Sequence, residues 1–500
     1  MNQLFLKFLF SLCLATPLFA ADELAISDYF NSLQNKPKTL NELIQAMPKG
    51  ADLHNHLSGA SYAENLLDYA KNDNLCFLKE TALAYLDTNC SAGNYLQNII
   101  QDSIEKDKII DSWSMRNFNP NASERSDQHF FRTFSKFKAI SNLHKSEMLA
   151  EVINRAAQQN ELYLEIMLRA DMDIAKELGQ GLSWNGNFDD MKKQLTEAGI
   201  ARAVQQIHQS LNQYKNDTQE LLQCKSAKPE KGCSVEVRFI HEIQRENSPS
   251  IVFSQLLAAF EAANTDLNLV SVNLVQAENG VIARRDYRLH MQMMAYFHKL
   301  YPQIHISLHA GELTNQVVPK EDLSFHITEA IKVAKAERIG HGLDILEENN
   351  AKELLTDMAN QHILVEINLS SNDHIYQLKG EEHPLRTYLE AKVPLALSTD
   401  DEGVNRSNLS KEYLKAIYEH HLSYQTLKEI SRNSLHYAFV EGKALFDNYD
   451  YTKPNKACAD DLLGNDTPSQ ACQLFLHENK KASLQWELEK RFRVFESSIN

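Results

Sequence analysis

Eight short, apolar runs of β-forming residues recur along this chain, and they constrain its fold more than any other feature. The runs cover residues 51–56, 162–168, 235–240, 267–274, 304–309, 337–341, 363–369 and 393–399. Longer segments with helical periodicity lie between them, among them residues 254–263, 287–299, 324–336 and 351–361. Alternating strands and helices are typical of parallel sheets covered by helices. Eight such units therefore predict an α/β fold, a closed (β/α)8 TIM barrel.

The first two runs are separated by about a hundred residues, far more than one crossover helix requires. We therefore predict an insertion at about residues 60–160, within a barrel that spans residues 49–410. The insertion leaves the end of the first strand, the rim where barrel active sites lie, so it is a candidate lid that shapes the substrate pocket. A structural or dimerisation element is an equal alternative, which leaves homodimer formation open. Residues 21–48 are an N-terminal segment and residues 411–500 a helical C-terminal extension in this interpretation.

The N-terminus has the layout of a secretory signal. Lys7 precedes an apolar run at residues 8–15, the segment PLFA follows at residues 17–20, and cleavage would fall near Ala20 or Ala21. This order predicts a signal peptide at residues 1–20 and an exported protein, either periplasmic or secreted. No later run approaches the ~20 apolar residues that span a bilayer. The formal net charge of -16 argues against nucleic acid and against anionic membrane surfaces as partners.

The cysteines fall into couples that are close in sequence. Cys13 lies in the predicted leader, and the other six form three neighbouring pairs. An even number suits an oxidising compartment, and short loops close at little entropic cost. We expect the disulfides Cys76–Cys90, Cys224–Cys233 and Cys458–Cys472, although the sequence alone does not determine the connectivity. A cysteine zinc site is disfavoured, because the chain contains no CxxC pair.

Metal-capable side chains stand at the ends of four predicted strands. His54 and His56 are two residues apart, so on a strand both point to one face, which in a barrel is the interior. His309, His341 and an Asp-Asp pair at 400–401 end the fifth, sixth and eighth strands. Side chains at one mouth of a barrel converge in space. Three histidines and a carboxylate are ligands that a catalytic zinc accepts, with water in the remaining position.

The motifs of other hydrolase classes are missing from the sequence. The chain contains no HExxH, no Walker loop and no GxSxG motif. The HxE and PCxxC pattern of cytidine-type deaminases is missing as well. The strand-end histidines are thus the motif that points to chemistry.

Four segments, in order, resemble the motifs of the adenosine deaminase family. They read MPKGADLHNHLSG at residues 47–59, HAGE at 309–312, RIGHG at 338–342 and STDD at 398–401, with further matches in NLSSN at 368–372 and HPL at 383–385. The resemblance covers roughly residues 49–413 apart from the insertion, and the exported, cysteine-paired form is similar to the extracellular growth-factor branch. It implies a hydrolytic deaminase on a (β/α)8 barrel that converts adenosine or deoxyadenosine to inosine or deoxyinosine and ammonia.

The resemblance also implies roles for single residues. One zinc ion per chain would be bound by His54, His56, His309 and Asp400. Glu312 would donate a proton to N1 of the purine while water attacks C6, and His341 would orient or deprotonate that water. Asp401 would hydrogen-bond N7. A glutamate can serve as the acid when burial raises its pKa.

Two positions depart from the family pattern. Ser58 stands where an aspartate usually meets the sugar, and it is shorter and uncharged. Gln276 replaces a glycine whose backbone approaches the purine, so its side chain either fills that space or reads a different base edge. Two alternatives therefore stay open. One is a deaminase of another aminopurine, such as adenine, an N6-modified adenine or a modified nucleoside, and the other is a non-catalytic nucleoside-binding or signalling protein.

Overall fold

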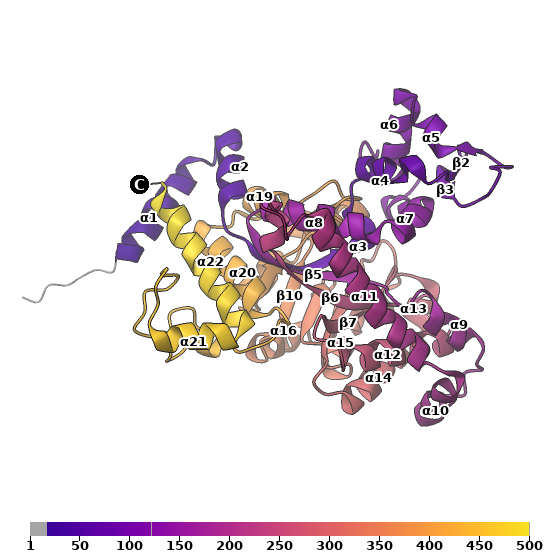
Figure 1. Ribbon diagram of the computed structural model, residues 1–500. Coiled ribbons are helices and arrows are strands. Elements are labelled where there is room, and N and C mark those ends of the chain that lie inside the picture. Colours follow the sequence, from indigo (N-terminus) through magenta and orange to yellow (C-terminus); the bar gives the residue numbers. More distant parts are fainter. Residues whose placement is uncertain (1–17, 122, 500) are drawn as a thin grey trace, which may run out of the picture.

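The computed structural model describes residues 18–121 and 123–499, and eight parallel strands form its centre (Figure 1). Neighbours in the sheet follow the order of the chain. The strands are β1 (Gly50–His56), β5 (Glu161–Leu168), β6 (Glu236–Gln244), β7 (Leu269–Val275), β8 (His305–Ala310), β9 (Arg338–His341), β10 (Leu364–Ile367) and β11 (Leu395–Leu397). Each strand occupies one of the eight predicted runs, shifted by a few residues at its ends.

The last strand returns to the first and closes the ring. Asp400 donates its N–H to the carbonyl of His54 at 2.8 Å, and its own carbonyl accepts from His56 N–H at 3.1 Å. Asn55 and Asp400 form a parallel bridge at the same place. The prediction of a (β/α)8 TIM barrel is confirmed, and its closure point coincides with the predicted metal ligands.

The strands are buried because both of their faces are covered. All residues of β1 and β5 are buried. In the interior, Arg338 pairs with Glu165 at 2.6 Å and with Glu366 at 2.7 Å. A buried arginine needs such partners, because an unpaired charge is costly in an apolar interior.

Helices follow the strands and cover the outside of the barrel. They are α8 (Lys145–Gln158), α9 (Ile174–Gln180), α10 (Phe188–Ala198), α11 (Ala201–Leu221), α12 (Pro249–Ala263), α13 (Val281–Arg285), α14 (Tyr287–Leu300), α15 (His326–Lys332), α16 (Ala351–Asn360), α17 (Leu369–Tyr376), α18 (Leu385–Glu390), α19 (Leu409–His420) and α20 (Tyr424–His436). Most are amphipathic, whereas α12 is buried almost throughout because α9, α11 and α14 pack around it. The predicted helix at 324–336 is shorter in the structure, where residues 320–324 form a 3-10 turn ahead of α15.

The segment between β1 and β5 forms a lobe beside the barrel, at the upper right of Figure 1. It contains α3 (Leu57–Ala60), α4 (Ala63–Tyr69), α5 (Leu96–Ile99), α6 (Ser103–Ser112) and α7 (Ser126–Leu143), with a small antiparallel sheet of β2 (Cys76–Leu78), β3 (Leu83–Tyr85) and β4 (Asn94–Tyr95). Helix α7 packs on α3 and α17, so the lobe returns to the rim of the barrel.

The first and last helices of the described residues meet on the opposite side of the barrel from this lobe, where α1 (Leu18–Ser32) lies against α22 (Lys480–Ser497) in Figure 1. Lys428 on α20 links them, because its Nζ lies 2.6 Å from Glu496 and 2.9 Å from Glu23. Helices α2 (Pro37–Ala46) and α21 (Gln470–Glu478) complete this side. The domain boundaries at residues 20, 48 and 410 stay predictions.

All three predicted disulfides are present. Cys76–Cys90, Cys224–Cys233 and Cys458–Cys472 close loops with sequence separations of 14, 9 and 14. Within residues 18–121 and 123–499, no helix combines the length and the apolar character that crossing a membrane requires. The first 17 residues of the predicted signal peptide lie outside the described residues. The expected cleavage position near Ala20 or Ala21 falls within α1.

Candidate metal centre and substrate pocket

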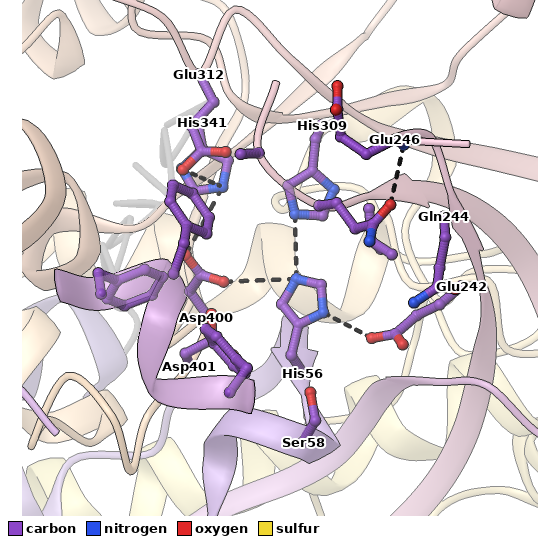
Figure 2. Close-up of a pocket in the computed structure, with 16 residues that line it drawn as sticks. His56, Ser58, Glu242, Gln244, Glu246, His309, Glu312, His341, Asp400 and Asp401 are labelled. Atoms are coloured by element: carbon purple, nitrogen blue, oxygen red, sulfur yellow. Dashed lines mark hydrogen bonds and ion pairs between the residues drawn. The ribbon is translucent and has the colours of Figure 1, made fainter. Parts of the chain in front are cut away.

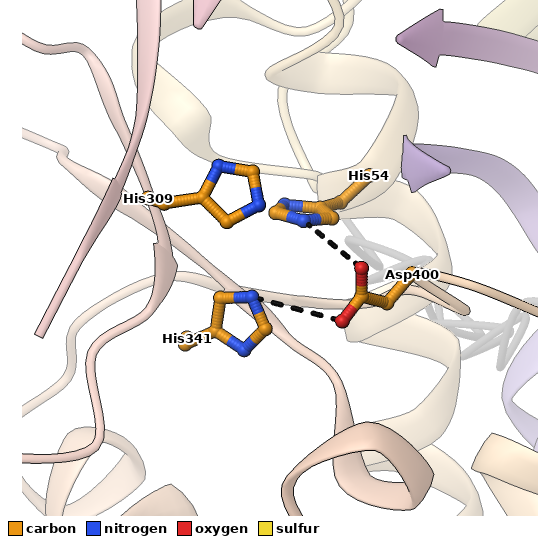
Figure 3. A group of neighbouring side chains, drawn as sticks. All are labelled: His54, His309, His341 and Asp400. Atoms are coloured by element: carbon orange, nitrogen blue, oxygen red, sulfur yellow. Dashed lines mark ion pairs between the residues drawn. The ribbon is translucent and has the colours of Figure 1, made fainter. Parts of the chain in front are cut away.

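Five side chains from four strands converge at the mouth of the barrel (Figures 2 and 3). Nε2 of His56 lies 3.1 Å from Nε2 of His309. Oδ1 of Asp400 is 3.5 Å from Nε2 of His56 and 3.7 Å from Nε2 of His54, and its Oδ2 is 3.7 Å from Nε2 of His341. The ligand atoms of His54, His309, His341 and Asp400 all lie within 4.8 Å of one another. The structure thus brings every residue of the predicted metal site together.

Three of these histidines have a hydrogen-bond acceptor behind the ring. The Nδ1 atoms of His54, His56 and His309 lie 2.7, 2.8 and 2.8 Å from Oε2 of Glu366, Oε1 of Glu242 and Oδ1 of Asn273, respectively. An acceptor at Nδ1 holds the proton there and leaves the Nε2 lone pair facing the centre, as in histidines that bind metals. Among the described atoms, Nε2 of His54 is buried and has no hydrogen-bond partner. These nitrogens and the Asp400 carboxylate fit a divalent cation such as zinc.

Two residues of the centre have backbone torsions in the left-handed region. The φ angles of His341 and Asp400 are 69° and 59°. Such torsions are strained for residues with a β-carbon and occur where a site holds a side chain in a required direction. Gly340 lies beside His341, and a β-carbon there would come within 2.6 Å of Cε1 of His54. The RIGHG segment therefore leaves room for a histidine from another strand.

Hydrogen bonds to the backbone at Gly311 and Glu312 fix the position of Glu312 beside the histidines. Glu278 accepts the N–H of Gly311 at 3.1 Å and that of Glu312 at 2.8 Å, and the Tyr376 hydroxyl donates to the Glu312 carbonyl at 2.8 Å. Oε1 of Glu312 lies 3.9 Å from Nε2 of His341. Burial, followed by the nearby carboxylates of Asp400 and Glu278, raises the pKa of Glu312 well above its usual value. Both effects favour the protonated, neutral form of this carboxyl group.

Asp401 is a further carboxyl group in the pocket. Burial and the adjacent Asp400 raise the pKa of Asp401 well above its usual value. Its Oδ1 is buried without a hydrogen-bond partner among the described atoms. Gly59 makes room for it, since a β-carbon at position 59 would lie 1.9 Å from that oxygen. This oxygen of Asp401 therefore packs against the backbone at Gly59.

A cavity of about 400 Å³ opens over the centre. Its lining includes the predicted substrate-binding residues Ser58, Gln276 and Asp401 together with Glu312 and His341. Three aromatic side chains and three polar side chains that the sequence analysis did not identify also line it, namely Phe130, Phe131 and Phe134 of α7 and Glu242, Gln244 and Glu246 at the end of β6. Apolar walls with a few directed polar groups are typical of pockets for small organic ligands.

Gln276 has an unusual backbone for a residue with a side chain. Its φ is 77°, a torsion that glycine adopts without cost. Its Oε1 accepts the backbone N–H of Glu246 at 2.9 Å, and Nε of Arg245 donates to its carbonyl at 2.9 Å. The amide is therefore held at the rim, and its Nε2 group has no acceptor among the residues that the structure describes.

Two of the polar residues that line the cavity, Glu242 and Gln244, could have been recognised from the strand pattern of the sequence. Glu242 and Gln244 continue β6 beyond the predicted end at residue 240, with the alternation of a strand. The three phenylalanines lie on one helix of the insertion and had no signal that linked them to the pocket. Their place depends on how α7 folds back over the rim.

Comparisons with known proteins agree with this arrangement. Residues 114–447 match the family model described as adenosine deaminase, a segment that begins after the strand with His54 and His56. An adenosine deaminase from Shewanella loihica is 34% identical over 145 residues, which cover 28% of this chain and 40% of that protein. The match therefore spans less than half the length of this relative.

Two solved structures share the fold at low identity. An amidohydrolase from Burkholderia ambifaria with bound Zn has a TM-score of 0.56 at 16% identity, with 92% of this chain and 94% of that chain covered. The N6-methyl-AMP deaminase from Arabidopsis thaliana has a TM-score of 0.51 at 22% identity, with 80% and 94% covered. Both likenesses concern the barrel as a whole.

Proposed function

The chain belongs to the adenosine deaminase family, and we propose that it catalyses the zinc-dependent hydrolytic deamination of adenosine and deoxyadenosine, which releases inosine or deoxyinosine and ammonia. One observation carries the proposal: Glu312, whose pKa is raised by burial, lines the same cavity as His56, His309 and Asp400. A purely binding protein has no need for this combination of an acid and a metal site.

The proposed zinc ligands are His54, His56, His309 and Asp400. A zinc ion held there supplies Lewis acidity, which lowers the pKa of a coordinated water towards ~7. Glu366, Glu242 and Asn273 keep the three imidazoles in the tautomer that this role requires. The bound Zn of the Burkholderia amidohydrolase supports the choice of metal.

Proton transfer is the task of the remaining residues. Attack of water on C6 of the purine pushes electrons onto N1, and the protonated carboxyl of Glu312 supplies the proton that N1 then needs. His341 faces Asp400 and Glu312 and orients the attacking water. Asp401, whose raised pKa favours the protonated form, donates to N7. The amine finally leaves as ammonia, so the reaction consumes one water.

The phenylalanines of α7 support the substrate-shaping role of the insertion. They face the same cavity as Ser58 and Gln276, so the purine would lie between an aromatic surface and the polar strand ends. Ser58 contributes a hydroxyl where a charged group would otherwise contact the sugar.

A second candidate substrate class is another aminopurine, including one that bears a phosphate. An adjoining cavity of about 350 Å³ shares Ser58, Phe134 and Gln276 with the first. Its lining adds three basic residues, Lys138, Lys145 and Arg169. In a chain with a net charge of -16 this is a local excess of positive charge. The Arabidopsis neighbour, by its name, acts on a methylated nucleotide.

The two lysines of this annex form no ion pair with the described residues, although the carboxylates of Glu242, Asp171 and Asp173 partly offset the lowering of the Lys145 pKa by burial. Nζ of Lys145 donates to the carbonyl of Arg169 at 2.6 Å, and neither Lys138 nor Lys145 pairs with a carboxylate of the described residues. Arg169 itself pairs with Asp173 at 3.1 Å. A phosphate would satisfy the two lysines through charge-assisted hydrogen bonds.

Ammonia release by the zinc-loaded protein tests both candidates, across adenosine, deoxyadenosine, adenine, AMP and N6-methyladenosine. Preferential turnover of adenosine and deoxyadenosine supports the first. Preferential turnover of AMP, with a loss of about tenfold in kcat/KM for AMP alone in Lys138→Gln, supports the second. The matched control is Lys136→Gln, since Lys136 is bonded to Ser112 outside the annex. No turnover of any compound, together with tight binding of one, would favour the non-catalytic alternative.

Export to the periplasm or beyond is part of the proposal. Three disulfides support an oxidising compartment, because such bonds are rare in reducing ones.

A further inference from the structure

We propose that Asn372 and His383 are positioning residues that hold His341 in the tautomer with its proton on Nε2. In this tautomer His341 is a hydrogen-bond donor towards the centre and not a metal ligand. Asn372 lies in α17, and His383 lies just before α18, so both stand behind His341 on the side away from the cavity. The tautomer itself is independent of the proposed reaction, whereas its consequence for catalysis rests on the proposed function.

The backbone N–H of Leu385 can act only as a hydrogen-bond donor. The N–H of Leu385 donates to Nδ1 of His383 at 3.1 Å. Burial, followed by the nearby His420 and His341, lowers the pKa of His383 to about 3, so its ring is neutral at physiological pH. A neutral imidazole whose Nδ1 accepts must carry its proton on Nε2.

That proton determines the orientation of the Asn372 amide. Nε2 of His383 lies 3.0 Å from Oδ1 of Asn372, and Nδ2 of Asn372 lies 2.9 Å from Nδ1 of His341. Because Oδ1 accepts from His383, the amide NH2 group faces His341 and donates to its Nδ1. His341 is then left with its proton on Nε2. His341, Asn372 and His383 are all buried, so no bulk water competes with these bonds.

The remaining polar neighbour of His341 selects neither tautomer. Nδ2 of Asn368 lies 3.5 Å from Nδ1 and 3.4 Å from Nε2 of the ring, nearly equal separations that favour neither nitrogen. The chain from Leu385 through His383 and Asn372 is therefore what sets the proton.

His341 thereby differs from the three other histidines of the centre. Behind their Nδ1 atoms stand acceptors, which leave lone pairs at Nε2, whereas behind Nδ1 of His341 stands a donor. Its Nε2–H points towards Oδ2 of Asp400 at 3.7 Å and Oε1 of Glu312 at 3.9 Å. A nitrogen that carries a proton cannot coordinate a cation. The geometry permits two sets of four ligands, in which either His56 or His341 joins His54, His309 and Asp400. The hydrogen-bond pattern excludes His341 and therefore favours the set with His56.

The tautomer is measurable without metal or substrate. In metal-free protein labelled with 15N-histidine, long-range 1H–15N spectra should show His341 protonated at Nε2, and His54 and His309 at Nδ1. A spectrum with the His341 proton on Nδ1 overturns the proposal on its own.

The cause of the tautomer is tested at both residues. Asn372→Leu removes the donor and should release His341 into a mixture of tautomers. His383→Leu should do the same from one residue further away, whereas His383→Gln, which still donates to Asn372, should retain the wild-type signal. An unchanged His341 signal in folded Asn372→Leu or His383→Leu refutes the assignment. The matched control is Asn273→Leu, which removes the acceptor behind His309 and should leave His341 unchanged.

A functional measurement separates positioning from metal binding. In zinc-loaded Asn372→Leu we expect one zinc per chain, a KM within about twofold of wild type, and a kcat lower by about tenfold, the usual scale of one lost hydrogen bond. Loss of zinc in proportion to activity would make the group a structural support of the metal and contradict the inference. A wild-type protein without deaminase activity would refute the proposed function and leave the tautomer measurement intact.

Discussion

Gly340 lies directly against the imidazole of His54. A β-carbon at position 340 would be 2.6 Å from Cε1 and 2.9 Å from Nδ1 of that ring, at the edge where Nδ1 meets Glu366. The glycine of the sixth barrel strand thus determines where a histidine of the first strand can stand.

Gly340→Ala should therefore weaken zinc binding. The added methyl group displaces the His54 ring, and we expect a zinc affinity lower by about 10–100-fold, as for changes behind a metal ligand. The measurement is competition with a chelator of known affinity. The control is Gly181→Ala, where the nearest atom to the new methyl lies at 3.5 Å. Equal zinc affinity in both variants would contradict the role of Gly340.

Glu312→Gln should abolish turnover and retain the metal. Gln cannot donate an acidic proton to N1, so kcat should fall by ~10²–10⁴-fold, the usual share of a general acid. Zinc content by elemental analysis should remain one per chain, because Glu312 is not among the proposed ligands. His54→Ala and Asp400→Ala, by contrast, should lose zinc and activity together. A Glu312→Gln variant with wild-type kcat would remove the assigned proton donor.

Phe134→Ala should weaken substrate binding more than chemistry. Phe134 lines both cavities from α7, and its loss removes an aromatic surface beside the purine. We expect KM to rise by about tenfold, given that an aromatic contact contributes on the order of 1 kcal/mol beyond its buried area. Steady-state kinetics with adenosine measures it. Phe137→Ala is a useful comparison, because Phe137 does not line the first cavity. A fall in kcat without a change in KM would argue against a contact between Phe134 and the purine base.

Asp344→Asn should stabilise the protein in a pH-dependent way. Both carboxyl oxygens of Asp344 are buried without a hydrogen-bond partner among the described atoms. Burial, followed by the charges of Glu278 and Glu348, raises its pKa well above the usual value. A raised pKa means that the stability of the wild type is complete below the unfolded-state pKa of about 3.9 and declines as the pH rises towards the folded-state pKa.

The Asp344→Asn variant has no carboxyl group at this position, so it does not lose stability in this way as the pH rises. We expect Asp344→Asn to be more stable than wild type by about 1–3 kcal/mol at pH 7 and nearly equal to it near pH 4. Urea unfolding of metal-free protein at both pH values measures the difference. A free-energy difference that does not change with pH would show that the Asp344 carboxyl already ionises normally in the fold.

The exported protein should contain three intact disulfides. Peptide mapping without reduction should recover the pairs Cys76–Cys90, Cys224–Cys233 and Cys458–Cys472. Replacing both cysteines of one pair by serine should lower the free energy of unfolding by about 2–4 kcal/mol. Free thiols in protein isolated from the exported fraction would contradict the proposed compartment.

The local features of this protein could be predicted from its residues alone. The eight apolar runs predicted the strands because periodicity is a local property of the chain, and the spacing of His54 and His56 placed both on one face of β1. The disulfides were predictable for the same reason, since each pair closes a loop of 9 or 14 residues. The order of the motifs led to the family.

The group that stands behind each functional side chain depends on the three-dimensional fold. Glu366 and Glu242 are 312 and 186 residues away in sequence from the histidines that they contact, and no local pattern couples them. The sequence also did not predict three other features of the site. They are the phenylalanines of α7 that line the cavity, the left-handed backbone of Gln276 and the hydrogen-bond donor behind His341. Strand register and barrel closure create these contacts, and both depend on packing across the whole chain.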